Sequence, residues 1–142
     1  MSVFVDTGVF YAQHDRDTER HESASEAMAT VASGTYGKPY TSDYIYDETV
    51  TLTRRRTSYE PAMRVSDRML GRGDFDEVVE LVFVDRAVFD RAVGVLERYD
   101  DQRLSVTDAT TVALVEARDI DSVLTFDDDF DGLVPRLDPT EV

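Results

Sequence analysis

Two acidic side chains follow apolar runs that predict buried strands. Asp6 comes directly after Val3–Val5, and Asp127 comes directly after Ser122–Phe126. Both runs are rich in β-branched and aromatic residues, which is typical of strands inside a sheet. Because ligands bind beyond the carboxyl ends of the strands in a parallel α/β sheet, we expect both carboxylates at one binding edge.

Glu48 lies on the apolar side of a predicted helix. In the helix that we expect over Asp43–Arg56, Tyr44 and Ile45 lie one turn before Glu48, where a leucine or alanine would be ordinary. A carboxylate that faces a core is costly unless it is paired or binds a metal ion. A shifted helix phase, or an ion pair with one of Arg54–Arg56, would also explain Glu48.

Asp108 is the fourth candidate, at the start of the helix expected over Thr107–Arg118. An acid in a first helical turn is favoured by the helix dipole or serves as a cap, so Asp108 alone is weak evidence of a site. Thr107 could cap the helix instead, which would leave Asp108 free to point towards the other acids.

Four carboxylates in one pocket predict a bound cation, because they cannot all stay ionised without one. Mg²⁺ and Mn²⁺ prefer oxygen ligands of this kind. Such ions support phosphodiester hydrolysis by activating water and by neutralising charge on the leaving oxygen. The chain has no cysteine, and this chemistry needs no side-chain nucleophile.

Strand patterns alternate with helix patterns along the chain, which predicts an α/β sandwich with a mostly parallel sheet. We expect Asp43 and Ser58 to cap their helices. The expected strands are 3–5, 39–42, 79–85, 122–126 and 133–137, and the expected helices are 7–14, 22–32, 43–56, 58–71, 86–99 and 107–118. The side chains expected on the buried face of helix 86–99 are Phe89, Ala92, Val93 and Leu96.

The composition indicates one globular domain over residues 1–142, with an unusually acidic surface. Thirty acids against fifteen bases give a net charge of −15, and Lys38 is the only lysine. This balance is typical of proteins adapted to high salt, where charge repulsion is screened, so the charge does not exclude an RNA substrate. The chain shows no membrane-spanning run and no signal-peptide pattern, and we expect a cytoplasmic protein.

Four stretches of the chain together resemble one known family, the PIN-domain ribonucleases and in particular the VapC-type toxins of toxin–antitoxin pairs. The resemblance runs end to end and rests on the order and spacing of the motifs. The four stretches are VDTGVFYA, TSDYIYDETVTLTRR, SVTDATTVALVEARDI and SVLTFDDDF, and the last is similar to the family's Thr-x-Asp-x-Asp-Phe motif.

The resemblance implies a three-layer α/β/α sandwich and a Mg²⁺- or Mn²⁺-dependent endoribonuclease. It implies that Asp6 and Asp108 bind the ion directly and that Glu48 and Asp127 complete the acidic pocket, by positioning waters or by holding a second ion. The supporting polar groups would be Thr7, Thr107 and Thr125. Family toxins usually form homodimers and are silenced by a small antitoxin that inserts into the acidic groove.

The two acids after Asp127 have different expected places in this scheme. Asp129 could join the metal site or only begin the last loop. Asp128 is expected to face solvent.

Alternative interpretations stay open for single motifs. Asp6-Thr7-Gly8 also resembles the catalytic loop of aspartic proteases, but those are all-β and a helix pattern follows here. Receiver-type domains need a lysine near the site, and Lys38 lies in a Gly-Pro turn context. A non-catalytic PIN-like module would use the same acidic pocket to dock a basic partner segment.

Arg54 and Arg55 could contact RNA phosphates, or they could pair with the excess acids. His14 and His21 fit neither the HExxH nor the zinc-finger spacing and are expected to be exposed to solvent.

The acidic composition makes the stability of the protein depend on salt. We expect the melting temperature to be clearly higher in molar KCl than in dilute buffer, because roughly 1 M salt shortens the Debye length to about 3 Å and screens the repulsion. Equal melting temperatures in the two buffers would contradict the interpretation as a halophilic surface.

Overall fold

The computed structural model describes all residues from 1 to 142, and its centre is a sheet of five parallel strands. The strand order is β3-β2-β1-β4-β5, so that β1 lies in the middle. The strands are β1 (Ser2–Val5), β2 (Lys38–Ser42), β3 (Glu80–Val82), β4 (Ser122–Leu124) and β5 (Arg136–Leu137). The expected α/β sandwich with a mostly parallel sheet is confirmed, and the all-parallel sheet is incompatible with an all-β protease.

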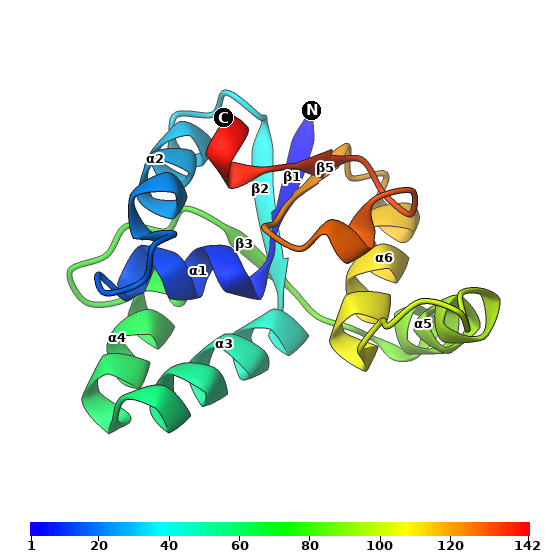
Figure 1. Cartoon of the computed structure of the whole chain (residues 1–142), viewed down its shortest axis with the longest axis horizontal. Helices are drawn as coiled ribbons and strands as arrows, with labels where there is room; N and C mark the ends of the chain where they lie inside the picture. Colours follow the sequence, from blue (N-terminus) through cyan, green and yellow to red (C-terminus); the bar gives the residue numbers. More distant parts are fainter.

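Six α-helices cover the two faces of this sheet. Figure 1 shows α1 to α4 on one side of the sheet and α5 with α6 on the other, which gives three layers. The helices are α1 (Thr7–His14), α2 (His21–Ala32), α3 (Asp43–Arg56), α4 (Tyr59–Leu70), α5 (Arg86–Arg98) and α6 (Val106–Arg118), and two short 3₁₀ helices are η1 (Asp128–Phe130) and η2 (Pro139–Glu141). Helices that follow one another pack as pairs, α1 with α2, α3 with α4 and α5 with α6.

The register of the sheet brings the ends of β1 and β4 together. Val5 pairs with Leu124, and the Asp6 N–H donates to the Leu124 carbonyl at 3.1 Å. Asp6 and Thr125 are therefore neighbours at the point where both strands end. The Thr41 hydroxyl of β2 also donates to the Val5 carbonyl at 3.0 Å, which ties the third strand to this edge.

One continuous apolar core holds the layers together. Both faces of the central strands contribute to it, and Val3, Phe4 and Val5 are all fully buried. Continuous apolar runs of this kind are expected in strands that are covered by helices on both sides. Because β1 is covered on both faces, its carboxyl end is fixed in position.

Several predicted strand ends and helix caps differ from the structure. The strands expected over 79–85 and 122–126 are shorter in the structure, over Glu80–Val82 and Ser122–Leu124. Both apolar runs continue beyond the residues that pair in the sheet. Ser42, and not Asp43, caps α3, since its hydroxyl accepts the Ile45 N–H at 3.1 Å.

Asp43 has a different role from the predicted one, whereas Ser58 has the predicted position. Asp43 accepts the Val84 N–H at 2.9 Å, which ties α3 to the segment after β3. Ser58 occupies the N-cap position of α4 as expected, but its side chain makes no capping hydrogen bond.

The expected buried face of α5 is partly wrong. Ala92 is buried and Leu96 is half-buried, whereas Phe89 and Val93 are 40% and 39% exposed. Val95 takes their place in the core. The reason is that α5 packs mainly against α6, so only a narrow stripe of the helix is covered.

No helix of this fold combines the length and the apolar character that crossing a membrane requires.

The cap of α3 fixes the helix that carries Glu48, and its removal has a measurable effect. We expect Ser42→Ala to lower the free energy of unfolding by about 1 kcal/mol, because a buried N–H of α3 is left without its acceptor. Ser58→Ala is the matched control and should change the free energy of unfolding much less, since this cap makes no side-chain bond. Chemical denaturation of the two variants tests the difference, and equal decreases would contradict it.

Candidate active site

A cleft of about 490 Å³ opens at the carboxyl ends of β1 and β4. All four acids singled out in the sequence line it, although they come from four separate segments of the chain. The lining residues are Asp6, Thr7, Gly8, Arg20, Glu48, Asp108, Thr125, Phe126, Asp127 and Asp128. The expected convergence of the four acids on one cleft is therefore present in the structure.

Asp6 is held in place by Thr125. The carboxylate is only 8% exposed, and its Oδ2 accepts the Thr125 hydroxyl at 2.8 Å. The same Thr125 oxygen accepts the backbone N–H of Asp127 at 3.0 Å. One buried hydroxyl thus links the end of β1 to the segment that follows β4.

The environment of Asp6 favours the uncharged carboxyl. The pKa of Asp6 is raised from 3.8 to about 7 in the metal-free protein, mainly by burial and to a smaller extent by the charges of Asp108 and Glu48. The hydrogen bond from Thr125 and the backbone N–H of Thr7 act in the opposite direction. Deprotonated Asp6 is thus a negative charge that needs a nearby positive charge.

Asp108 has both of the roles that the sequence allowed. Its carboxylate accepts the Ser105 N–H at 3.1 Å, and the Ser105 hydroxyl accepts the Asp108 N–H at 3.0 Å, which forms a capping box. Ser105 is therefore the cap of α6, and the interpretation of Thr107 as the cap is wrong. The capping box holds the Asp108 carboxylate at the wall of the cleft, where burial and the nearby acids Asp127 and Glu48 raise its pKa.

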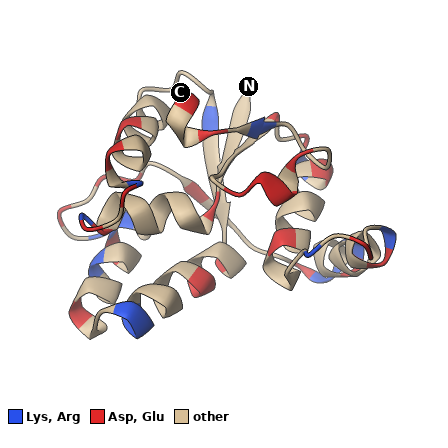
Figure 2. Cartoon of the chain, viewed as in Figure 1, with Lys and Arg blue, Asp and Glu red and all other residues tan.

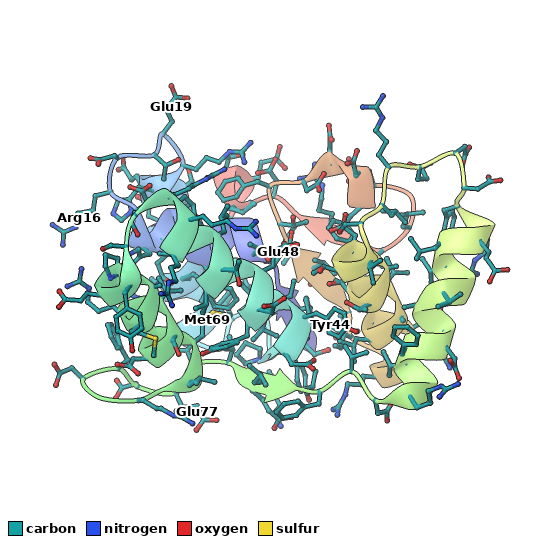
Figure 3. All side chains as sticks on the ribbon, turned by 90° about the horizontal axis from the view of Figure 1, so that it is seen from below. Arg16, Glu19, Tyr44, Glu48, Met69 and Glu77 are labelled. Carbon is teal, nitrogen blue, oxygen red and sulfur yellow. The ribbon has the colours of Figure 1, made fainter.

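Glu48 lies beside the buried stripe of α3. The buried stripe of the helix is Ile45, Thr49 and Thr53, and Glu48 is half-buried next to it. Figure 3 places Glu48 near the middle of the molecule in a view from below. Glu48 makes no ion pair with Arg54–Arg56 or with any other base, so pairing does not explain its position.

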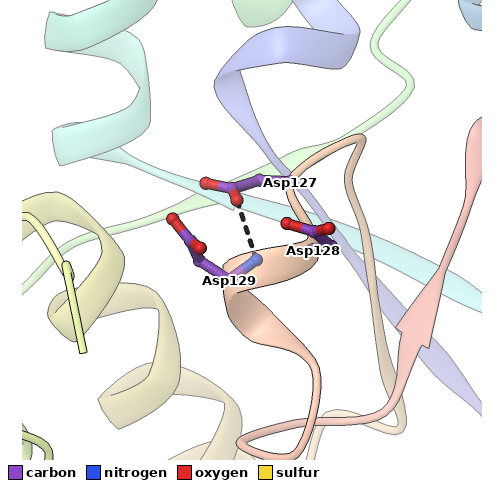
Figure 4. A group of neighbouring side chains, drawn as sticks. All are labelled: Asp127, Asp128 and Asp129. Atoms are coloured by element: carbon purple, nitrogen blue, oxygen red, sulfur yellow. Dashed lines mark hydrogen bonds between the residues drawn. The ribbon is translucent and has the colours of Figure 1, made fainter. Parts of the chain in front are cut away.

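The acidic run after β4 turns back on itself. Asp127 caps η1, because its Oδ1 accepts the Asp129 N–H at 2.9 Å, as the dashed line in Figure 4 shows. Asp128 is exposed and lines the cleft, while Asp129 is exposed and does not line it. These three carboxylates are the only set of three potential metal-ligating side chains whose oxygens all lie within 4.8 Å of one another.

The three threonines of the predicted site are placed differently. Thr125 supports Asp6 as described, and Thr7 lines the cleft with a buried hydroxyl that has no hydrogen-bond partner. Thr107 does not line the cleft, and only its backbone carbonyl is used, as the acceptor of the Thr110 hydroxyl.

Arg20 is a cleft residue that sequence reasoning missed. Its guanidinium lies 4.7 Å from the centre of the Phe126 ring, and it is the only cationic side chain that lines the cleft. It makes no ion pair with the surrounding carboxylates. No local signal points to Arg20, because Phe126 is far away in the sequence.

Arg54 and Arg55 lie outside the cleft, at the exposed end of α3. Neither forms an ion pair with an acid, and Arg54 stacks on Tyr59 at 5.2 Å. The interpretation that they pair with the excess acids is not supported by the structure.

The side chains of the cleft suit a hard divalent cation. Its donors are carboxylate oxygens and the unpartnered Thr7 hydroxyl, with no sulfur or imidazole among them. An all-oxygen donor set favours Mg²⁺ or Mn²⁺ over softer metals. A cation there would also stabilise the ionised form of Asp6.

The PIN domain family matches residues 3–133, and the chain belongs to this family. The chain is 29% identical over 131 residues to the 23S rRNA-specific endonuclease VapC20 of Mycobacterium tuberculosis. The aligned region covers 90% of the chain and 91% of that protein. The chain is also 24% identical over 117 residues to the VapC ribonuclease of Archaeoglobus fulgidus. That alignment covers 82% of the chain and 71% of the ribonuclease.

Solved structures share the fold over nearly the whole chain. The crystal structure of Mycobacterium tuberculosis VapC20, described as a Sarcin-Ricin loop cleaving toxin, matches with a TM-score of 0.78 and 27% identity over 90% of this chain and 92% of that one. A toxin–antitoxin complex from Klebsiella pneumoniae matches with a TM-score of 0.66 at 15% identity, over 96% and 97% of the two chains.

The raised pKa of Asp6 predicts a stability that depends on pH. The unfolded chain loses this proton near pH 4, whereas the folded metal-free protein keeps it until about pH 7. The ionised carboxylate therefore lowers the free energy of unfolding progressively between these pH values, by up to about 4 kcal/mol above pH 7.

Asp6→Asn should remove this decrease in the free energy of unfolding, because asparagine does not ionise. In EDTA the variant should be more stable than the wild type at pH 8 and similar to it at pH 4. Chemical denaturation at both pH values measures the effect. A variant that is no more stable than the wild type at pH 8 would contradict it.

Proposed function

We propose that the chain is a Mg²⁺- or Mn²⁺-dependent endoribonuclease and the toxin of a toxin–antitoxin pair. The observation that carries the proposal is the convergence of four carboxylates on one cleft at the carboxyl edge of the sheet. The family match and the names of the relatives, an rRNA endonuclease and a ribonuclease, support RNA as the substrate. We further propose that residues 1–142 act as one PIN-like domain, supported by the single continuous core.

Asp6, Asp108 and Asp127 are the side chains that would hold the ion, with Glu48 and Asp129 as further candidates. A divalent ion there supplies Lewis-acid chemistry, which makes water a better nucleophile and offsets charge on the leaving oxygen. The deep position of Asp6 and the capping box around Asp108 fix two of these carboxylates before any ligand binds.

Glu48 differs from the other three acids because it makes no hydrogen bond within the protein. Its carboxylate is therefore free to accept a proton or to orient a water molecule next to the scissile phosphate. General-base catalysis requires such an unoccupied acceptor within hydrogen-bond reach of the attacking water.

Arg20 would contact the substrate phosphate, because it is the only cationic side chain that lines the cleft. Its stacking on Phe126 holds the guanidinium over the cleft without using up its N–H donors. Guanidinium groups bind phosphate oxygens with paired hydrogen bonds. Arg20 would thereby offset part of the repulsion between the RNA and the acidic walls.

The same cleft would dock the antitoxin. The resemblance implies an antitoxin that inserts into the acidic groove, and the carboxylates there would attract a basic segment of such a partner. The bound segment would block access of the substrate. Homodimer formation belongs to the same proposal and rests on the resemblance alone.

Cleavage of RNA tests the proposal directly. Asp6→Asn and Asp127→Asn should each lower the cleavage rate by more than about 100-fold, because each removes a charged ligand. Asp101→Asn is the matched control, because it removes the same charge from an exposed acid that does not line the cleft, and it should keep most of the activity.

Wild-type activity should disappear in EDTA and return with Mn²⁺. Cleavage at the wild-type rate by the Asp6→Asn variant would overturn the proposal. A wild type that never cleaves RNA but binds a basic peptide through the cleft would favour the non-catalytic module instead.

A further inference from the structure

A second cavity, of about 640 Å³, lies where α1 and α3 end, and its lining is basic. Three arginines face a single acid there, in a chain whose net charge is −15. Its charged and titratable lining residues are His14, Asp15, Arg16, His21, Arg64 and Arg68. We call this the basic cavity.

Arginines are concentrated at the end of α3 and on α4, which form one wall of the basic cavity. Residues 54–72 hold six arginines against Glu60 and Asp67, a net charge of +4. Figure 2 shows this charge as blue segments at the end of α3 and on α4. None of the six arginines forms an ion pair with an acid of the chain, so their charge is available to an anionic ligand.

Two of the arginines lie near His14, and His14 and His21 are both half-buried in the structure instead of exposed as predicted. Burial lowers the pKa of His14, and the nearby charges of Arg64 and Arg68 lower it further. The Arg68 guanidinium stacks on Phe75 at 4.8 Å. This crowding of cationic groups disfavours a metal cation at His14 and His21 and favours an anion.

The cavity also has polar groups with no partner inside the protein. The Nε of Arg68 and the Oε1 of Gln13 are buried and make no hydrogen bond. The Nδ1 of His21 lies 2.8 Å from the Ala12 carbonyl, which can only accept, so this nitrogen carries the proton. The one acid, Asp15, is already bound by the Tyr11 hydroxyl at 2.7 Å.

The basic cavity and the acidic cleft lie along the same two helices. Helix α1 begins with Thr7 and Gly8 in the cleft and ends with His14 in the cavity. Helix α3 carries Glu48 in the cleft and is followed by Thr57 in the cavity. At 1.5 Å per residue the two sites are separated by about 10–14 Å along the helices, which is roughly three to four nucleotides of a stacked strand.

We propose that the basic cavity binds a phosphate of the RNA strand a few nucleotides away from the bond that is cut in the acidic cleft. The inference rests on the proposed function. Arginine forks match phosphate oxygens, and RNA is a continuous polyanion that can reach both sites at once. A chain with net charge −15 repels RNA elsewhere, so the basic cavity supplies attraction where the substrate needs it. An acidic peptide would match the charge, but it carries no phosphodiester for the proposed ion in the acidic cleft to act on.

Binding of single-stranded RNA in EDTA tests the inference without requiring cleavage. The variant Arg64→Ala/Arg68→Ala should weaken binding of an RNA long enough to reach both sites. The logarithm of the binding constant falls linearly with the logarithm of the salt concentration. The magnitude of this slope should decrease by about 0.7 for each phosphate that the variant no longer binds. Arg91→Ala/Arg118→Ala removes the same charge from exposed positions outside the cavity and should leave the slope unchanged.

Two further measurements separate a loss of RNA binding from misfolding and from a loss of catalysis. Arg64 is exposed, so Arg64→Ala alone repeats the test if the double variant does not fold. Cleavage of a dinucleotide with Mn²⁺ should be the same in wild type and variants, because so short a substrate cannot span the two sites.

Equal effects in the cavity and control variants, or no effect in either, would overturn the inference while leaving the proposed function intact. A poly-glutamate peptide that binds through Arg64 while RNA does not would also overturn it, in favour of a protein ligand. A wild type that neither binds nor cuts RNA would instead remove the proposed function itself.

Discussion

The carboxylate of Asp6 is the constraint on which the carboxyl edge of the sheet depends. Asp6 is the only acidic or basic residue among the buried residues, and it lies at the end of the central strand. A buried carboxylate needs hydrogen bonds and an opposite charge. The Thr125 hydroxyl supplies the first, and because it also accepts the Asp127 N–H, the same contact fixes the start of the acidic run.

Local backbone contacts hold the remaining acids with different strength. The capping box of α6 fixes Asp108, and the turn of η1 fixes Asp127 through the Asp129 N–H. Glu48 has no such contact, and its carboxylate oxygens are without a hydrogen-bond donor in the protein. In the proposed function, the three hydrogen-bonded carboxylates would hold the cation, because binding needs fixed ligands. Glu48 would accept the proton, because proton transfer needs an unoccupied acceptor.

Much of this site follows from the sequence, because strand ends and helix stripes have clear patterns. Asp6 and Asp127 were identifiable from the apolar runs before them, and Glu48 from its place beside an apolar stripe. The caps were misjudged by one or two residues, since the choice between Ser42 and Asp43 depends on which oxygen reaches the N–H. Arg20 and the basic cavity depend on contacts between segments far apart in the chain, for which the sequence has no local signal.

The position of a bound ion tests the central claim most directly. A crystal grown or soaked with Mn²⁺ should show an anomalous peak at ligand distance, about 2.0–2.2 Å, from carboxylate oxygens of Asp6 and Asp108. The exposed group Asp127, Asp128 and Asp129 is the alternative position, because its oxygens already lie close together. A peak within that group alone, away from Asp6, or no peak at all, would contradict the account.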